Sequence, residues 1–153
     1  GGLVYAIGAN SPEVAIDANS EEQKKLYVQG GTLIAVGRLE SGAQISGGTC
    51  KQTSSFTAET WYALYDGSAL VAAFKTPTTS SSNSGGGPGG RPGGGGSGGG
   101  SKKLVVYTSS TPALKSGVTV SDGTEYFDGA VNIGGTVTRG TSVSLSNYSS
   151  GGR

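Results

Sequence analysis

Short apolar runs alternate along this chain with small polar residues, and glycine stands at many of the breaks. Residues 33–36 (Leu-Ile-Ala-Val) form a continuous apolar run, which favours a strand buried on both faces. Residues 13–18 alternate instead, with Val14, Ile16 and Ala18 on one side, as in a half-buried strand. Such runs recur throughout and predict an all-β fold, with less than about a tenth of the residues in helices.

A helix competes with this interpretation at one place. The run Ser20-Glu21-Glu22-Gln23 has the spacing of a helix-capping box. Residues typical of strands return at once at Leu26-Tyr27-Val28, so the pattern favours a turn or a single helical turn. Strands near 3–7, 13–18 and 26–28 would then form a three-sided coil of about 25–30 residues.

An internal repeat supports this coil. Residues 1–8 (GGLVYAIG) align with residues 30–37 (GGTLIAVG) at an offset of 29 positions, and four positions are identical. A period of this length is typical of solenoids, in which successive coils stack. The repeat therefore predicts that strands 3–7 and 32–36 pair in parallel, about 4.8 Å apart.

The clearest local element is a β-hairpin over residues 59–75. Asp66-Gly67 separates two runs rich in strand-forming residues, 60–65 and 68–74, which is a strong hairpin signal. A two-residue Asp66-Gly67 loop would place Tyr65 opposite Ser68. One face of the hairpin would then carry Trp61, Ala63, Tyr65, Leu70 and Phe74, and the other Tyr62, Leu64, Val71 and Ala73.

Composition divides the chain into three parts. Residues 78–101 contain 12 of the 30 glycines and no hydrophobic residue, which is typical of a flexible linker. We predict that this linker contributes nothing to the fold. Residues 1–77 would form terminal coils with the hairpin as their cap. Residues 102–153 contain short strand-like runs at roughly ten-residue spacing and would form a small C-terminal β module.

Several of these runs resemble one protein family. They are VYAIGANSPEVAIDAN at 4–19, LYVQGGTLIA at 26–35, TWYALY at 60–65, FKTP at 74–77 and LKSGVTVS at 114–121. Together they resemble the C-terminal third of carbohydrate-binding domain-containing surface proteins of gut Bacteroidota. These proteins are relatives of a clostridial β-helix protein that binds cellulose and pectic acid.

The resemblance implies the end of a right-handed parallel β-helix, displayed on the outer cell surface through a lipoprotein signal. It also implies calcium in the full-length parent, mainly in earlier coils rich in Asp and Asn. No ligand cluster in this chain matches such a site, so its metal ligands remain unknown and we expect no cofactor in this part. The chain has no Met and begins in mid-pattern, so we expect a C-terminal fragment whose first strand is covered by earlier coils or another surface protein.

Composition also excludes some function classes. The formal net charge is +1 and no stripe of Lys or Arg occurs, so the sequence predicts no nucleic-acid partner. No apolar run approaches the length of about 20 residues that spans a bilayer. The absence of His excludes a Ser-His-Asp triad or a His-ligated metal within the chain. The single cysteine, Cys50, is expected to be a small buried hydrophobic residue.

The candidate binding residues are the hairpin aromatics Trp61, Tyr62 and Tyr65. Flat aromatic faces stack on sugars, so these rings could bind a polysaccharide, although packing in the core of the cap is the competing role. Asp66 is expected to be a turn residue. The acids are expected to be solvated turn residues rather than a catalytic pair or a calcium loop: Glu13, Asp17, Glu59, Asp122, Glu125 and Asp128.

Three function classes follow from the sequence. We expect a non-catalytic, cell-surface protein that binds a polysaccharide. The alternative is a structural β-helix cap, an adhesin stalk or an accessory subunit of a surface assembly. A polysaccharide-degrading enzyme is the third class, which would need two carboxylates converging in a groove.

Overall fold

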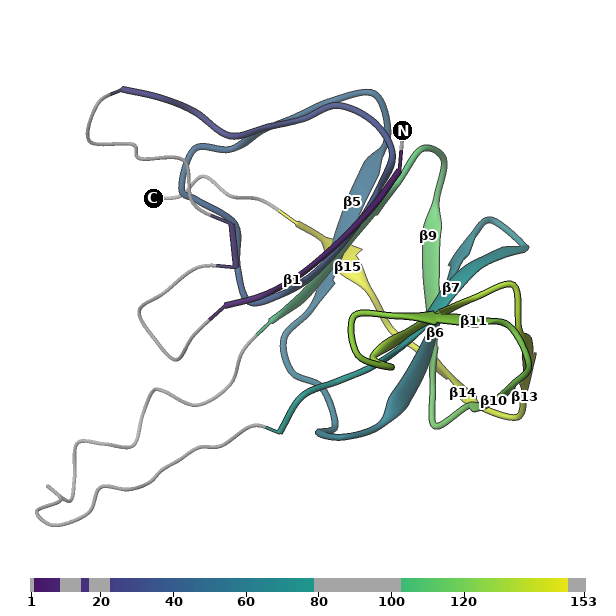
Figure 1. Cartoon of the computed structure of the whole chain (residues 1–153). Coiled ribbons are helices and arrows are strands. Elements are labelled where there is room, and N and C mark those ends of the chain that lie inside the picture. Colours follow the sequence, from purple (N-terminus) through teal and green to yellow (C-terminus); the bar gives the residue numbers. More distant parts are fainter. Residues whose placement is uncertain (1, 9–14, 17–22, 79–102, 149–153) are drawn as a thin grey trace, which may run out of the picture.

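The fold is all-β, as the sequence predicts (Figure 1). The computed structural model describes residues 2–8, 15–16, 23–78 and 103–148. These residues form fifteen strands, β1 to β15, and contain no helix. The competing helix signal at 20–23 lies outside the described residues except for Gln23, and so does the predicted strand 13–18 except for Ala15 and Ile16.

The first sheet contains five strands in the order β1-β3-β8-β5-β15. Its strands are β1 (Leu3–Ile7), β3 (Thr32–Val36), β8 (Leu104–Thr108), β5 (Thr49–Thr53) and β15 (Ser146–Asn147). β1 and β3 pair in parallel from Leu3 opposite Thr32 to Ile7 opposite Val36. This register has the offset of the sequence repeat and confirms the predicted parallel pair.

Parallel contacts continue away from the first sheet. Ile16 forms an isolated parallel bridge with Leu39, and β2 (Tyr27–Val28) pairs in parallel with β4 (Gln44–Ile45). Residues 2–48 therefore form two successive coils, which contact each other in parallel at three places. Residues 2–8, 15–16 and 23–29 belong to the first coil, and residues 30–48 to the second.

Strand β8 interrupts this parallel arrangement. It lies between β3 and β5 and pairs antiparallel with both, so β5 is separated from β3 although the two strands point the same way. All five residues of β8 are buried. β15 then pairs antiparallel with β5 at the far edge of the sheet. The described residues therefore do not form a closed solenoid.

The second sheet contains six strands in the order β11-β12-β7-β6-β9-β14. Its strands are β11 (Thr124–Tyr126), β12 (Val131–Ile133), β7 (Ala69–Lys75), β6 (Trp61–Asp66), β9 (Pro112–Ser116) and β14 (Thr141–Val143). Both sheets combine strands from before and after residues 79–102. The segments 1–77 and 102–153, which the sequence divides into two units, thus share both sheets. The predicted linker lies outside the described residues except for Thr78.

The β6–β7 hairpin is present, but its predicted register needs correction. Asp66 pairs with Ala69, so Gly67 and Ser68 form the loop, and the pairing shifts again between Leu64 and Tyr65. Gly67 has φ 65°, as the first central residue of a tight hairpin turn requires. The two shifts place Phe74 opposite Tyr62, whereas the pattern had placed it on the face of Trp61.

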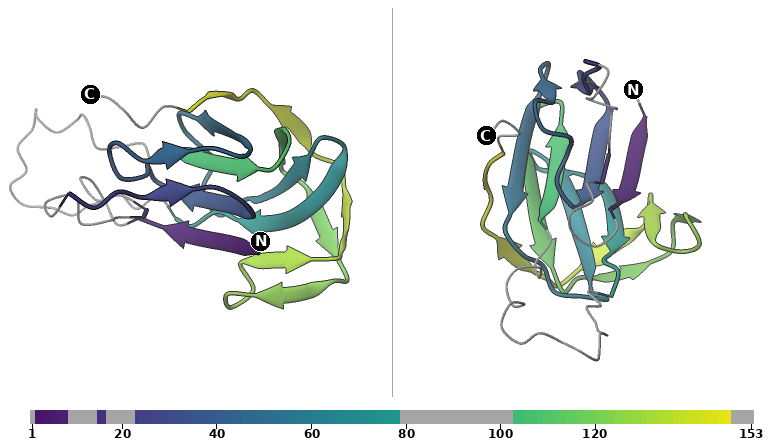
Figure 2. Two further views of the ribbon diagram at one scale, coloured as in Figure 1. Left: turned by 90° about the horizontal axis from the view of Figure 1, so that it is seen from above. Right: turned by 90° about the vertical axis from the view of Figure 1, so that its left-hand side faces the viewer.

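The strands between residues 112 and 143 form one long two-stranded ribbon with two bends (Figure 2). Along it β9 pairs with β14, β10 (Thr119–Ser121) with β13 (Thr136–Thr138), and β11 with β12. Its two ends pair with opposite sides of the β6–β7 hairpin, β9 with β6 and β12 with β7. The ribbon therefore wraps around the hairpin.

Residues with positive φ stand at both bends of the ribbon. The first bend has Gly117 opposite Arg139 and Gly140, and the second has Asp122 and Gly123 opposite Gly134. Glycine adopts positive φ without a steric penalty, so these positions allow both strands to turn together.

Two hydrophobic clusters lie on the two faces of the first sheet. Ile34 and Val36 of β3 point into the cluster between the two sheets, together with Phe74. Leu33 and Ala35 point into the second cluster, which the coil residues around Leu39 cover. Because β3 is buried on both faces, residues 33–36 are all apolar and form one continuous run.

Candidate functional site

Strand β6 presents the three predicted aromatic residues on two different faces. Tyr62 is only 3% exposed and belongs to the cluster between the sheets. Its ring stacks on Phe74 with 5.7 Å between centroids, and its hydroxyl accepts a hydrogen bond of 2.9 Å from the Thr57 N–H. No face of the Tyr62 ring is therefore open to a sugar, and Tyr62 has the competing role of a core residue.

Trp61 and Tyr65 lie on the opposite face of β6 and are both half-buried. They are four positions apart, or about 13 Å along the strand. Lys115 of β9 pairs with Ala63, midway between them, and its Nζ lies 5.5 Å from the centroid of the Tyr65 ring. This face, which we call the β6 aromatic face, consists of Trp61, Tyr65 and Lys115.

Asp66 has a structural role at the end of β6. Its Oδ1 accepts hydrogen bonds from the N–H groups of Ser110 (3.1 Å) and Thr111 (2.8 Å), and its Oδ2 accepts one from the Ser109 hydroxyl (3.2 Å). Partial desolvation raises the pKa of Asp66, but the hydrogen bonds outweigh it and hold the pKa below its ordinary value. The carboxylate thus fixes the turn between β8 and β9.

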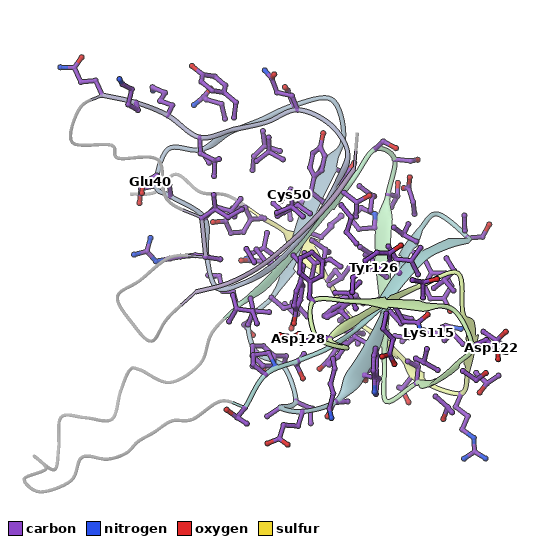
Figure 3. The ribbon with its side chains drawn as sticks, in the orientation of Figure 1. Glu40, Cys50, Lys115, Asp122, Tyr126 and Asp128 are labelled. Carbon is purple, nitrogen blue, oxygen red and sulfur yellow. The ribbon has the colours of Figure 1, made fainter. Side chains whose placement is uncertain are left out.

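The other reactive side chains of the described residues lie apart from the β6 aromatic face. Cys50 is buried, and desolvation raises the pKa of its thiol to about 12, so the thiol is neutral at physiological pH. Asp122 and Asp128 have positive φ at turns and lie at well-separated places (Figure 3). Within the described ranges, no three His, Cys, Asp or Glu side chains group as metal ligands. Glu13 and Asp17 lie outside these ranges.

An exposed apolar surface, which the sequence pattern predicts only in part, lies beside β1. Six large hydrophobic residues are exposed in the described part of the chain: Val4, Ile7, Tyr27, Tyr126, Phe127 and Ile133. The first three belong to the first coil, and the others to the β11–β12 hairpin and its turn. The Tyr126-Phe127 pair stands beside a turn signal, and no sequence pattern indicates that it belongs to an exposed surface.

Strand β1 is the last strand of its sheet, and within the described residues no strand pairs with its outer edge. Val4 and Ile7 are 50% and 48% exposed, whereas their β3 partners Leu33 and Val36 are 5% and 0% exposed. The difference arises because β3 has a neighbouring strand on both sides and β1 on only one.

The β11–β12 hairpin projects beyond this open edge, as both views in Figure 2 show. Tyr126 pairs with Val131, which in turn pairs with the core residue Phe74. Opposite residues in a ladder share a face, so Tyr126 and Ile133 lie on the core-facing side of the second sheet. They are exposed because the first sheet ends at β1, before it reaches them.

An aromatic contact joins this overhang to β1. The Tyr5 ring lies 5.7 Å from the Phe127 ring and 6.1 Å from the Phe74 ring, and its hydroxyl donates a hydrogen bond of 3.0 Å to the Lys75 carbonyl. We call the exposed residues Tyr126, Phe127 and Ile133 the shelf. The contact between Tyr5 and Phe127 places the shelf beside the face of β1 that points toward the second sheet.

Comparisons with protein-family models, with curated proteins and with solved structures found no match to this chain. The part of the chain that the structure describes contains no helix long and apolar enough to span a bilayer.

Proposed function

We propose that this chain is a non-catalytic structural piece that closes one end of a stack of parallel β coils, the end of a right-handed parallel β-helix at the cell surface. One observation carries the proposal: strand pairing is parallel at one side of the first sheet and antiparallel at the other. The location at the cell surface follows from the family resemblance.

The antiparallel side is suited to ending a stack. A further parallel coil at this side would meet β15, which runs against β5 and consists of only two residues. Very short edge strands are one way in which proteins prevent further strands from pairing. The β6–β7 hairpin and the ribbon around it cover the adjoining face of the sheet.

The parallel side is suited to continuing the stack. The Gly2 carbonyl and the Gly8 N–H both bond to the second coil, so even-numbered residues of β1 point their backbone groups toward β3. The N–H groups of Leu3, Tyr5 and Ile7 therefore point outward, because backbone groups alternate along a strand. Covering the exposed parts of Val4 and Ile7 would stabilise the fold by roughly 1 kcal/mol each.

A variant with residues 1–29 duplicated in tandem before Gly1 tests this proposal, because it places a copy of β1 at the observed offset. We expect a soluble monomer in which the amides of Leu3, Tyr5 and Ile7 of the original β1 gain strong protection from hydrogen exchange. The amides of Val4 and Ala6 already face β3 and serve as internal controls. Unchanged exchange at the three outward amides would contradict the proposal.

Polysaccharide binding is the second candidate function, and the β6 aromatic face favours it. Two half-buried aromatic rings on one strand face, with a lysine between them, offer stacking surfaces and a cation for an acidic sugar. Electrophoresis through gels that contain pectic acid or hydroxyethyl cellulose tests this function.

On this second proposal, Trp61→Ala and Tyr65→Ala abolish the retardation of the protein by polysaccharide. Lys115→Gln weakens the retardation by pectic acid alone, because only that polymer carries carboxylates. Tyr27→Ala, on an exposed aromatic residue of the first coil, is the matched control and leaves retardation unchanged. Equal mobility of the unsubstituted protein with and without either polymer would exclude both glycans as ligands.

A further inference from the structure

The shelf beside β1 has a geometry that specifies its occupant. Leu3 and Tyr5 pack against the cluster between the sheets, and Ile7 pairs with Val36 of that cluster. The odd-numbered residues of β1 therefore face the second sheet. A strand that pairs with β1 in parallel register would turn its corresponding residues in the same direction, onto Tyr126, Phe127 and Ile133.

We propose that the shelf binds the inward-facing side chains of the next parallel β coil and selects apolar residues there. This inference deepens the proposed end-piece function and rests on it. The occupant is a strand parallel to β1 with apolar residues opposite Leu3, Tyr5 and Ile7. A charged residue at these positions would be buried against Tyr126 and Ile133 without a partner, which is strongly unfavourable.

Two observations favour a coil over an isolated strand or a second copy of this chain. The first coil contacts the second in parallel not only at β1 but also at Ile16 and at β2. Tyr27 on β2 is 60% exposed, so the apolar end of the first coil extends to another side of the molecule. A parallel coil covers both places at once, whereas a strand paired with β1 alone would leave Tyr27 exposed.

The tandem variant with duplicated residues 1–29 also serves as the probe for the shelf. Its added Leu-Val-Tyr-Ala-Ile strand repeats β1, so its inward positions are Leu, Tyr and Ile. We expect hydroxyl-radical labelling of Tyr126 and Phe127 to fall at least threefold relative to the unextended chain. We also expect the melting temperature to rise by roughly 5 °C.

Substitutions then test whether the shelf itself is responsible. Ile133→Lys should remove at least half of the gain in melting temperature that the added coil gives, and so should Lys in place of the central Tyr of the added strand. Ala69→Lys is the matched control, because Ala69 is an exposed residue of the same sheet near the β6–β7 turn. This control should leave the gain unchanged.

The outcomes separate this inference from the proposed function. The shelf proposal would be overturned, and the end-piece function left intact, if the β1 amides are protected but the labelling of Tyr126 is unchanged. In that case the added coil would also raise the melting temperature equally in Ile133→Lys and Ala69→Lys. Unprotected amides would overturn both. A dimer of the unextended chain that protects Tyr126 and dissociates on Ile7→Lys would assign the shelf to a second copy, and this too would overturn the proposal.

Discussion

Individual residues show how tightly the centre of the first sheet is packed. Gly48 immediately precedes β5, and a Cβ atom there would lie about 2.8 Å from the Tyr107 ring and overlap the Thr108 carbonyl. Tyr107 is fully buried and its hydroxyl donates a hydrogen bond of 2.6 Å to the Ser46 carbonyl, so the ring cannot move aside without losing this bond. The close approach of β5 and β8 therefore requires glycine at position 48.

We expect Gly48→Ala to lower the free energy of unfolding by about 2–3 kcal/mol, because the added methyl group forces β5 and β8 apart. Gly30→Ala is the control, since a Cβ there meets nothing within 4 Å and its φ is not positive. Urea denaturation of the two variants and the parent measures the difference. Equal stability of both variants would show that β8 does not approach β5 at this position.

Asp66 gives a prediction about pH. Its pKa is lowered in the folded protein, so its contribution to stability is fully present above the pKa of the unfolded chain and is lost as pH falls through the lower folded value. The loss therefore occurs below about pH 4, where aspartate in an unfolded chain protonates. We expect Asp66→Asn to lower the melting temperature at pH 7, with a smaller difference from the parent at pH 3. A difference that is constant with pH would contradict the role of the charge.

Tyr62 gives a prediction that separates core from surface. Tyr62→Ala should destabilise the protein by about 3–5 kcal/mol, because it leaves a cavity beside Phe74. Tyr62→Phe should lose only about 1 kcal/mol, the contribution of its hydrogen bond to the Thr57 N–H. Chemical denaturation of both variants measures these values, and a small effect of Tyr62→Ala would return the residue to the candidate sugar-binding set.

At the scale of elements, the sequence predicts strands better than it predicts their partners. The glycine pairs and apolar runs at 1–8 and 30–37 repeat at the same offset as the paired residues of β1 and β3. The sequence repeat therefore predicts the β1–β3 pair. The sequence also predicts the β6–β7 hairpin, but the loop lies one residue after the predicted position. Asp66 ends β6 instead of starting the loop, because its carboxylate accepts hydrogen bonds from residues 109–111. That interaction joins positions far apart in the sequence, and no local pattern reveals it.

The same limit applies to the candidate site. Alternation along β6 separates Tyr62 from Trp61 and Tyr65, but it does not indicate which of the two faces is buried. The residues that share the face of Tyr62 depend on the hairpin register, which brings Phe74 opposite Tyr62. A small error in the loop therefore hides the core position of Tyr62. The shelf was missed for a similar reason, since Tyr126 and Ile133 form a surface only where the first sheet ends.

At the scale of the whole molecule, β8 makes the two halves of the chain depend on each other. The run 104–107 is apolar and predicts a strand, but nothing in it indicates that this strand enters between β3 and β5. Its backbone groups pair on both sides, and its side chains join both hydrophobic clusters. Neither half can therefore complete the first sheet alone.

We expect the fragment 1–77 to show no cooperative thermal transition by circular dichroism. Mixing it with the fragment 102–153 should restore the transition, because β8 can then enter between β3 and β5. A cooperative transition of 1–77 alone, near the melting temperature of the whole chain, would show that it is an independent unit after all.

The position of β8 also has a consequence for synthesis on the ribosome. β3 and β5 emerge well before β8, and until β8 follows they have no direct pairing with each other. The central edges of both strands and the apolar side chains of β3 stay uncovered during this interval, and such surfaces favour association between nascent chains. The centre of the first sheet is thus completed late in translation. The rate at which residues 54–108 are synthesised sets how long β3 and β5 remain without β8 between them.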